Sequence, residues 1–230
     1  MTLSEEIKVK LLERGASIVG FADLSVIPEK DRSGFKNGII LGIAVRPEVI
    51  RGIGDGPTME YYNEYNRINK LLNEIGEYTE NLLKEKGFGA LAKTQKVVVA
   101  DESTWRTELP HKTVATRAGI GWIGKSALLV TEEFGSAVRI TSVLTNAELE
   151  TGQPINESKC GTCNACKEVC PAGAVSGELW DVSKDRDQFY NAFDCRKKAR
   201  ERSAEIGLEV TLCGLCILHC PWTQAYLKRL

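Results

Sequence analysis

The placement of the cysteines constrains this chain more than any other feature. All eight cysteines of the 230 residues lie between positions 160 and 220. A reducing cytosol disfavours a disulfide framework, so this concentration needs another explanation. The sequence therefore predicts a cysteine-free N-terminal domain, residues 1–150, followed by a compact module, residues 151–230, built around something that cysteines hold.

The spacing of the cysteines points to iron–sulfur clusters. The first run, CGTCNACKEVCP, has the CxxCxxCxxxCP pattern of bacterial ferredoxins, in which three thiolates bind one cluster and the fourth binds another. A second run, CGLCILHCP, and a lone cysteine in FDCRKK complete the set. We expect one 4Fe–4S cluster on Cys160, Cys163, Cys166 and Cys220, and a second on Cys170, Cys195, Cys213 and Cys216.

Zinc is the alternative to iron and sulfide for this number of cysteines. Two structural zinc sites of four thiolates each satisfy the same count. Zinc does not explain the proline that follows each run. It also does not explain why the first run has three closely spaced cysteines for one cluster and a fourth for another. The pattern therefore favours iron–sulfur clusters.

Composition and charge narrow the class of protein. The chain is 43% apolar, which is enough for a sizeable core, and its net charge of -1 gives no global attraction to nucleic acid or anionic lipid. The N-terminal segment MTLSEEIKVKLLERG carries charges throughout, unlike a signal or transit peptide. No uncharged apolar run approaches the roughly 20 residues of a membrane helix. We expect a soluble, cytoplasmic protein with no membrane partner.

The N-terminal part has the pattern of a mixed α/β domain. A helix is predicted from a cap at Thr2 or Ser4 to a stop at Gly15, and a longer one from Tyr61 to Gly87. The apolar stripe of the long helix faces either the core or a cofactor, and the core is the usual case. Strands are predicted for ASIVGFA (16–22), GIILGIAV (38–45), TQKVVVA (94–100) and AVRITSVLT (137–145).

The segment RAGIGWIGKSALLV, residues 117–130, satisfies two nucleotide-binding patterns at once, GxxxxGKS and GxGxxG. Both patterns need a strand before the glycines and a helix after them. Here a helical pattern, ELPHKTVATRA, comes first and a short apolar run follows. This context argues against a phosphate loop or a dinucleotide turn. Two interpretations of the segment remain: a glycine-rich bend that lets Trp122 pack tightly, or a contact surface for another cofactor.

Together with the double cysteine run, this segment resembles the epoxyqueuosine reductases, relatives of the cobalamin-dependent reductive dehalogenases. It is similar to that family's AGLGWIGKN segment. The resemblance implies an α+β chain, with a nitroreductase-like domain that holds cobalamin and a ferredoxin-like double-cluster module that feeds it electrons. It also implies that the bend contacts the corrin through Arg117, Gly119, Gly121, Trp122, Ile123, Gly124 and Lys125.

Two departures from the family shape the expected substrate. The family's Asp-x-Gly-Pro stretch supplies a proposed proton donor, and an ungapped count places Trp105 there. The chain ends at Leu230, soon after Cys220, without the family's C-terminal helical repeats that are associated with tRNA. The basic stretch RKKARER is interleaved with acids and reads as a solvated helix face. We therefore expect a small organic substrate rather than tRNA, with reduced ferredoxin or flavodoxin as electron donor.

The proton donor has to be sought elsewhere in the segment before the bend. His111 is one of only two histidines, and Glu108 lies three residues earlier. Our expectation is that His111 donates the proton with Glu108 as its partner, and that Asp101 is the alternative donor. A histidine bonded to backbone at the start of a helix is the structural alternative for His111.

Two other functions remain open at this point. One is a ferredoxin-type electron-transfer protein that binds no corrinoid. The other is a flavin-dependent reductase, in which FMN occupies the same α/β domain. The leading expectation is an iron–sulfur oxidoreductase that passes electrons through two clusters to cobalamin.

Overall fold

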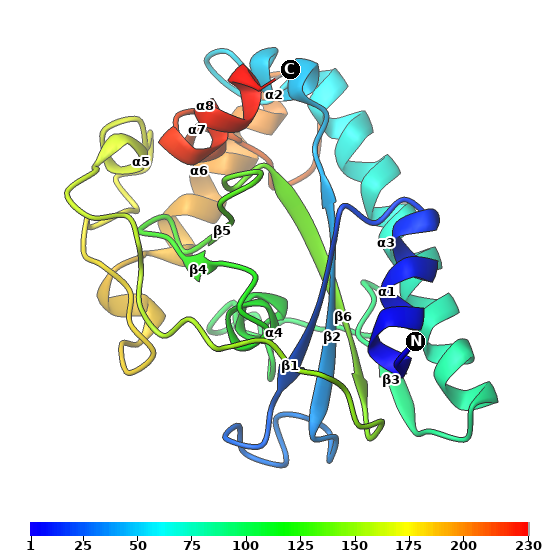
Figure 1. Ribbon diagram of the computed structural model, residues 1–230. Helices are drawn as coiled ribbons and strands as arrows, with labels where there is room; N and C mark the ends of the chain where they lie inside the picture. Colours follow the sequence, from blue (N-terminus) through cyan, green and yellow to red (C-terminus); the bar gives the residue numbers. More distant parts are fainter. Residues whose placement is uncertain (230) are drawn as a thin grey trace. The chain divides into compact units, whose positions relative to one another are not determined.

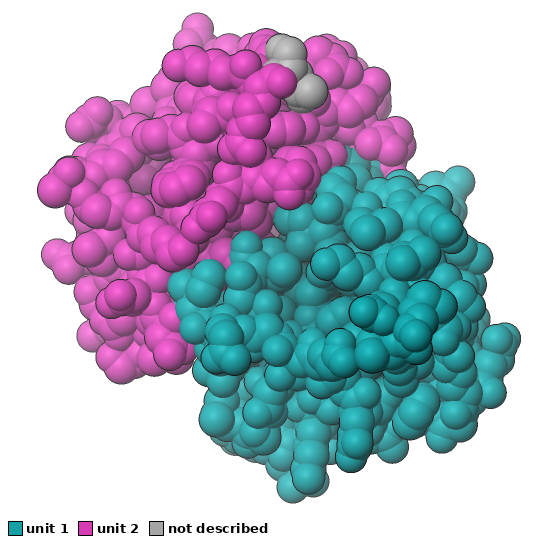
Figure 2. Space-filling view, in the orientation of Figure 1, with its two compact units in different colours: residues 1–43, 68–120, 139–155 teal, residues 44–67, 121–138, 156–230 magenta. Residues whose placement is uncertain are grey.

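The computed structural model describes residues 1–229. Within it the chain forms two compact units, each made of three separate stretches (Figure 2). Unit 1 comprises residues 1–43, 68–120 and 139–155, and unit 2 comprises residues 44–67, 121–138 and the chain from Asn156 onward. The units do not follow the division at residue 150 that the cysteines suggest, because two earlier stretches pack with the cysteine-rich part.

Contacts inside unit 2 show why the earlier stretches join it. The backbone N–H of Val45 donates to the carbonyl of Ala137 at 2.9 Å, and the Tyr226 hydroxyl donates to the carbonyl of Val45 at 3.1 Å. A β-carbon on Gly135 would lie 2.2 Å from the backbone nitrogen of Thr223. The cysteine-rich part therefore completes its packing with residues that come much earlier in the chain, 181 positions earlier in the case of Val45 and Tyr226.

Unit 1 is built on a four-stranded sheet in the order β1-β2-β6-β3 (Figure 1). Both β1 with β2 and β3 with β6 are antiparallel pairs, with Ile18 opposite Gly42 and Ala90 opposite Thr145. The strands are β1 (Ile18–Asp23), β2 (Asn37–Ala44), β3 (Ala90–Ala92) and β6 (Val138–Thr145).

Helices cover both faces of this sheet. Helices α1 (Leu3–Glu13) and α3 (Met59–Glu85) lie on one side and α4 (His111–Arg117) on the other (Figure 1). Consecutive residues of β2, among them Ile39 and Ile40, are fully buried as a result. This is why the strand is a continuous apolar run rather than an alternating one.

The two helices predicted in the first 90 residues are confirmed in detail. Thr2 caps α1 through a reciprocal capping box with Glu5, and Gly15 follows in the left-handed conformation. The stripe of α3 faces the core, since Tyr61, Ile68 and Ile75 are buried. The choice between a core face and a cofactor wall is therefore settled for these residues in favour of the core.

The strand predicted for residues 94–100 is wrong. The backbone N–H of Lys93 makes the last sheet bond, to the carbonyl of Ser142, and the chain then turns at Thr94. Val99 is 82% exposed, and no strand partner lies beside it. Without a partner, three consecutive β-branched residues do not make a strand.

Unit 2 is made of short elements joined by turns. A two-stranded hairpin pairs Trp122 with Val130 and Ile123 with Leu129. The elements are α2 (Pro47–Arg51), β4 (Trp122–Ile123), β5 (Leu129–Val130), α5 (Ala165–Glu168), η1 (Arg186–Gln188), α6 (Ala192–Ala204), α7 (Leu215–Leu218) and α8 (Pro221–Lys228). The basic stretch predicted as a helix face lies on α6.

Candidate functional site

The glycine-lysine-serine segment is the tip of the β4–β5 hairpin, not a phosphate loop. The N–H of Gly124 donates to the carbonyl of Leu128 at 2.8 Å, and Ala127 takes the left-handed conformation that closes the turn. Helix α4 precedes the hairpin and no helix opens at Lys125. The expectation that the context is reversed is therefore confirmed, and both nucleotide-binding readings fail on geometry.

The glycines of the bend are explained by contacts within the chain. Gly119 ends α4 with a φ of 71°, and a β-carbon there would lie 2.5 Å from the carbonyl oxygen of Gln153. A β-carbon on Gly121 would lie 2.2 Å from the carbonyl oxygen of Val130. These sides of the glycines face the protein's own backbone, so contact of the bend with a corrin stays a prediction that these contacts do not support.

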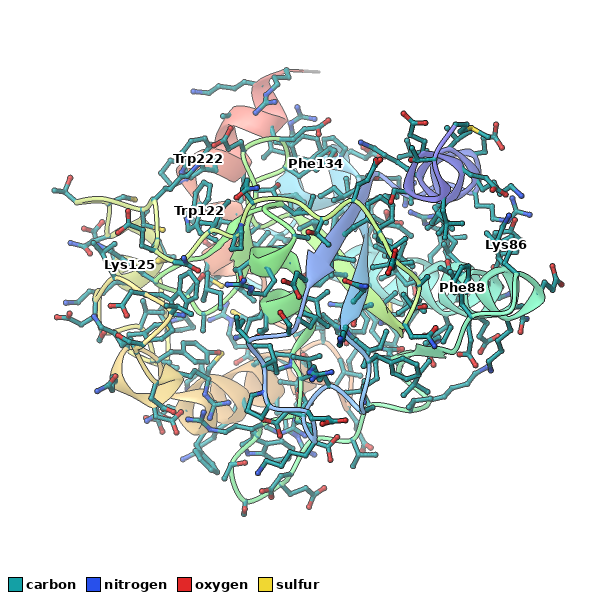
Figure 3. The ribbon with its side chains drawn as sticks, turned by 60° about the horizontal axis from the view of Figure 1, so that its bottom comes forward. Lys86, Phe88, Trp122, Lys125, Phe134 and Trp222 are labelled. Atoms are coloured by element: carbon teal, nitrogen blue, oxygen red, sulfur yellow. The ribbon has the colours of Figure 1, made fainter. Side chains whose placement is uncertain are left out.

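Trp122 anchors the hairpin to the last helix of unit 2. Its ring packs edge-on against Trp222 of α8, with ring centroids 5.1 Å apart, and it is fully buried (Figure 3). The ammonium of Lys159 lies 5.5 Å from the Trp122 ring centroid. The Trp122 indole N–H has no hydrogen-bond partner, an unusual state for a buried donor.

The hairpin tip and one group of cysteines enclose a cavity of about 80 Å³. Its lining consists of Gly124, Lys125, Ser126, Val130, Cys160, Cys163, Cys166, Cys216, Cys220, Pro221 and Trp222. Burial raises the pKa of Cys166 to about 11. The neighbouring sulfurs of Cys160, Cys220 and Cys163 raise this pKa further, which identifies them as the electrostatic neighbours of Cys166.

The remaining four cysteines are neighbours of one another. Burial raises the pKa of Cys195, and Cys170 and Cys213 add to the increase, while a hydrogen bond from the Tyr190 hydroxyl opposes it. Burial likewise raises the pKa of Cys216, followed by the effects of Cys195 and Cys213. Cys216 also feels Cys166 and borders the cavity of the first group, so the two groups adjoin. Among residues 1–229, no three His, Cys, Asp or Glu side chains converge closely enough for a single metal ion.

Lys125 is buried at the edge of the cysteine cavity. Its side chain is 4% exposed, and Nζ donates to Oδ1 of Asn164 at 3.1 Å. Asn164 stands between Cys163 and Cys166 in the first run. Lys125 is therefore not an ordinary surface charge.

Unit 1 contains a separate pocket of about 480 Å³, with polar and apolar side chains in its lining, between α3, the start of α4 and β6. It is lined by Asn69, Leu72, Asn73, Gln95, Val98, His111, Arg139, Ile140 and Thr141. Arg139 Nε donates to Oδ1 of Asn69 at 2.6 Å. The pocket arises because β3 is short and leaves the first half of β6 without a neighbour on that edge.

His111 opens α4 inside this pocket. Its Nδ1 lies 2.9 Å from the Ser142 hydroxyl oxygen. Burial lowers the pKa of His111 to about 4, and the charges of Lys93 and Arg139 contribute to the decrease. The ring is therefore neutral at pH 7, and it does not supply the imidazolium that a proton donor with a matched pKa would need.

The structure does not bring the three predicted proton-transfer residues together. Glu108 is exposed and lines a different cavity, of about 160 Å³, which it shares with Lys93. Asp101 is exposed, and its carboxylate accepts hydrogen bonds from the Ser103 hydroxyl and N–H, which lower its pKa. Asp101 is therefore an ionised turn residue, and the groups that shift the pKa of His111 besides burial are the cations Lys93 and Arg139.

Several residues of these sites are not predicted from the sequence. Asn164 and Trp222 lie inside or beside the cysteine runs, where the cysteines alone drew attention. Tyr190 is five residues before Cys195 and donates to its sulfur. Their proximity to cysteines in sequence was the available signal, but Lys93, which is 9% exposed, had none.

Comparisons with known proteins agree with this geometry. Residues 159–223 match the family model described as the 4Fe-4S double cluster binding domain. An epoxyqueuosine reductase of Bacillus anthracis is 37% identical over 118 residues, which is 50% of this chain and 30% of the relative. The chain thus spans about a third of that relative's length. The predicted resemblance to the epoxyqueuosine reductases and the prediction of a double 4Fe–4S cluster part in the cysteine-rich region are confirmed.

Solved structures share the fold. A reductive dehalogenase structure, described as suggesting a mechanism for B12-dependent dehalogenation, superposes with a TM-score of 0.71 at 17% identity, over 95% of this chain and 31% of that one. An epoxyqueuosine reductase bound to an epoxyqueuosine-modified tRNA stem loop superposes with a TM-score of 0.63 at 20% identity, over 97% of this chain and 66% of that one. The α+β class with a double-cluster part is confirmed.

These comparisons also correct two expectations. A small-molecule substrate and the exclusion of tRNA were expected, and both are wrong, since the relatives are epoxyqueuosine reductases and one solved neighbour holds a tRNA stem loop. None of the comparisons supports the flavin alternative. As for a membrane, none of the helices described within residues 1–229 combines the length and apolarity needed to cross one.

Proposed function

We propose that this protein is an iron–sulfur reductase in which two 4Fe–4S clusters and a corrinoid carry electrons to a modified nucleoside of tRNA. The observation that carries the proposal is the sorting of the thiols into two groups, each drawing on both cysteine runs. The relation to epoxyqueuosine reductases supports the substrate class. The fold shared with a B12-dependent dehalogenase supports the corrinoid.

The donor set fits iron–sulfur clusters. Cys160, Cys163, Cys166 and Cys220 are proposed to hold one cluster, and Cys170, Cys195, Cys213 and Cys216 the other. Burial favours the neutral thiol at Cys166, so the thiolate form requires positive charge in the cavity. Metal binding supplies that charge and releases the protons.

For the corrinoid we propose the pocket of unit 1, in a domain that we interpret as nitroreductase-like. Its volume of about 480 Å³ falls within the usual range for small ligands, and its carboxamides, from Asn69, Asn73 and Gln95, match the amide-rich edge of a corrin. The pocket is large enough for part of such a cofactor. Gly121 and Trp122, which pack against protein, are not included among the proposed contacts.

Within this pocket His111 is proposed to orient a bound group rather than to protonate it. The ring is neutral at pH 7 and its Nδ1 pairs with the Ser142 hydroxyl, which leaves Nε2 for a second hydrogen bond. Arg139, steadied by Asn69, presents positive charge beside it. Together these residues offer directed hydrogen bonds and positive charge to an electron-rich or anionic part of a ligand.

The test is turnover of an epoxyqueuosine-modified tRNA stem loop. The protein is purified anaerobically and incubated with cobalamin and a chemical reductant, and the nucleoside is analysed by mass spectrometry. Removal of the epoxide oxygen as water consumes electrons and protons, so we expect a product that has lost one oxygen atom. The reaction should stop in Cys220→Ser, which is deficient in one cluster.

A ferredoxin-type electron carrier is the second candidate, because residues 159–223 match a 4Fe-4S double cluster binding domain and such clusters can carry electrons without a further cofactor. An unchanged stem loop, combined with clusters that reduce and reoxidise normally and no uptake of cobalamin, would favour the carrier. An unchanged stem loop in protein that does bind cobalamin would contradict only the proposed substrate, and not the proposed cofactors.

A further inference from the structure

A buried cation stands beside the first cysteine group without a matching carboxylate. Lys125 is 4% exposed and its ammonium bonds to Asn164, whose amide oxygen is neutral. Among the residues described, 1–229, no acidic side chain forms an ion pair with Lys125. An ammonium removed from water without a counter-charge is costly, so this burial needs a reason.

The thiols around the same cavity supply the missing negative charge once they hold a cluster. The hairpin tip is close to them, since a β-carbon on Gly124 would lie 3.6 Å from the sulfur of Cys160. Lys125 borders the cavity together with Cys160 and Cys163. A 4Fe–4S cluster on four thiolates is an anion, and each electron that it accepts makes it more negative.

We infer that Lys125 is the counter-charge of the cluster held by Cys160, Cys163, Cys166 and Cys220, and that it raises the reduction potential of this cluster selectively. The inference rests on the proposed function, because it needs the clusters. A fixed positive charge in a medium of low dielectric stabilises the reduced form more than the oxidised form. Charge and hydrogen bonding around the sulfurs are established controls of cluster potential.

The second cysteine group has a different environment. Its hydrogen-bond donors are neutral: the hydroxyl of Tyr190 donates to Cys195, and the backbone N–H of Ala174 donates to the sulfur of Cys170 at 3.4 Å. Of the cations that follow Cys195 on α6, Lys197 is exposed and Lys198 pairs with Glu201 at 2.5 Å, while Arg196 is half-buried and has a partner of its own. Lys125 should therefore distinguish the two clusters, with the one beside it reduced at the higher potential.

The experiment is a redox titration followed by electron paramagnetic resonance on the anaerobically purified full chain. Lys125→Met keeps the length and removes the charge, and it should lower the midpoint potential of one cluster and leave the other unchanged. Lys125→Arg keeps the charge and should retain the wild-type midpoint. Lys159→Met is the matched control, because Lys159 adjoins Cys160 but is half exposed and paired with Glu132; its effect should be smaller.

The cluster that shifts is identified with Cys195→Ser, which disturbs only the second cluster. Unchanged midpoints in Lys125→Met, equal shifts of both clusters, or a shift no larger than that of Lys159→Met would overturn the inference.

If Lys125→Met loses the cluster, Asn164→Asp provides the second test. The new carboxylate neutralises Lys125 and should also lower the midpoint, and an unchanged midpoint would overturn the inference. Absence of clusters from the wild type would instead contradict the proposed function.

Discussion

Gly124 and Cys160 are neighbours at the cluster cavity, so a β-carbon at position 124 would be in van der Waals contact with the Cys160 sulfur. Its β-carbon would lie 3.6 Å from the Cys160 sulfur and 2.8 Å from the Val130 side chain. Gly124→Val should therefore displace the hairpin tip and reduce the iron content by about half, because only one of two clusters is affected. Gly34→Val is the control: its β-carbon would meet open space, and the strain at its φ of 80° falls in a turn of unit 1, which contains no cysteine, so the full iron content should remain. Equal iron in both variants would show that this contact does not matter.

The crossed ligand assignment predicts that single cysteine variants lose one cluster each. Cys195→Ser should damage the cluster that also uses Cys170, and Cys220→Ser should damage the other. In each case iron and sulfide should fall from about eight to about four per chain. The resonance spectra of the two variants should add up to that of the reduced wild type, apart from the coupling between clusters. Loss of the same signal in both variants would mean that the ligands are grouped differently.

The environment of His111 predicts a histidine that stays neutral well into the acid range. Burial and the charges of Lys93 and Arg139 lower its pKa to about 4 from the usual 6.5. Nuclear magnetic resonance of histidine-labelled protein measures this directly, since the chain has only two histidines and His111→Gln assigns the signals. A measured pKa near 6.5 would contradict the buried placement.

This lowered pKa also has a consequence for stability. The unfolded chain takes up the proton at higher pH than the folded one, so stability is lost as pH falls from 6.5 toward 4. At pH 5 the loss from this residue is about 2 kcal/mol relative to pH 7.5. His111→Gln should remove that part of the acid sensitivity, which urea unfolding at the two pH values would reveal.

The exposure of the segment after β3 predicts that a lysine substitution there affects stability much less than the same substitution in β2. Val99→Lys should change the free energy of unfolding by less than about 0.5 kcal/mol, because Val99 is 82% exposed. Ile40→Lys should prevent folding, because it places a charge in a strand buried on both faces. A large loss of stability in Val99→Lys would mean that the segment packs as the strand its sequence suggests.

The sequence was sufficient where local pattern and tertiary structure agree. The cap at Thr2, the stop at Gly15 and the apolar run around Ile39 each act locally, and each is found as expected. The strand prediction for residues 94–100 failed because a strand needs a neighbouring strand to pair with. The run of valines in the sequence cannot show whether such a neighbour exists. The compact units differ from the predicted division at residue 150 for a similar reason, since contacts such as Tyr226 to Val45 join positions that are distant in sequence.

The same distinction between local and long-range contacts applies to the residues of the candidate site. Cysteine spacing predicted the two groups of thiols because cluster ligation fixes short distances along the chain. It could not reveal that Lys125 points at the same cavity, because a hairpin between Trp122 and Val130 brings it there. The pairing of His111 with Glu108 assumed that proximity in sequence implies a shared pocket, and the chain instead places them in different cavities.

Spin quantitation of the reduced protein tests the central claim most directly. The anaerobically purified chain is reduced fully, its resonance spectrum is integrated against protein concentration, and iron, sulfide and zinc are measured on the same sample. Two adjoining 4Fe–4S clusters predict about two interacting spins per chain, with iron and sulfide in equal amounts and little zinc. A silent spectrum with stoichiometric zinc and no sulfide would contradict the account.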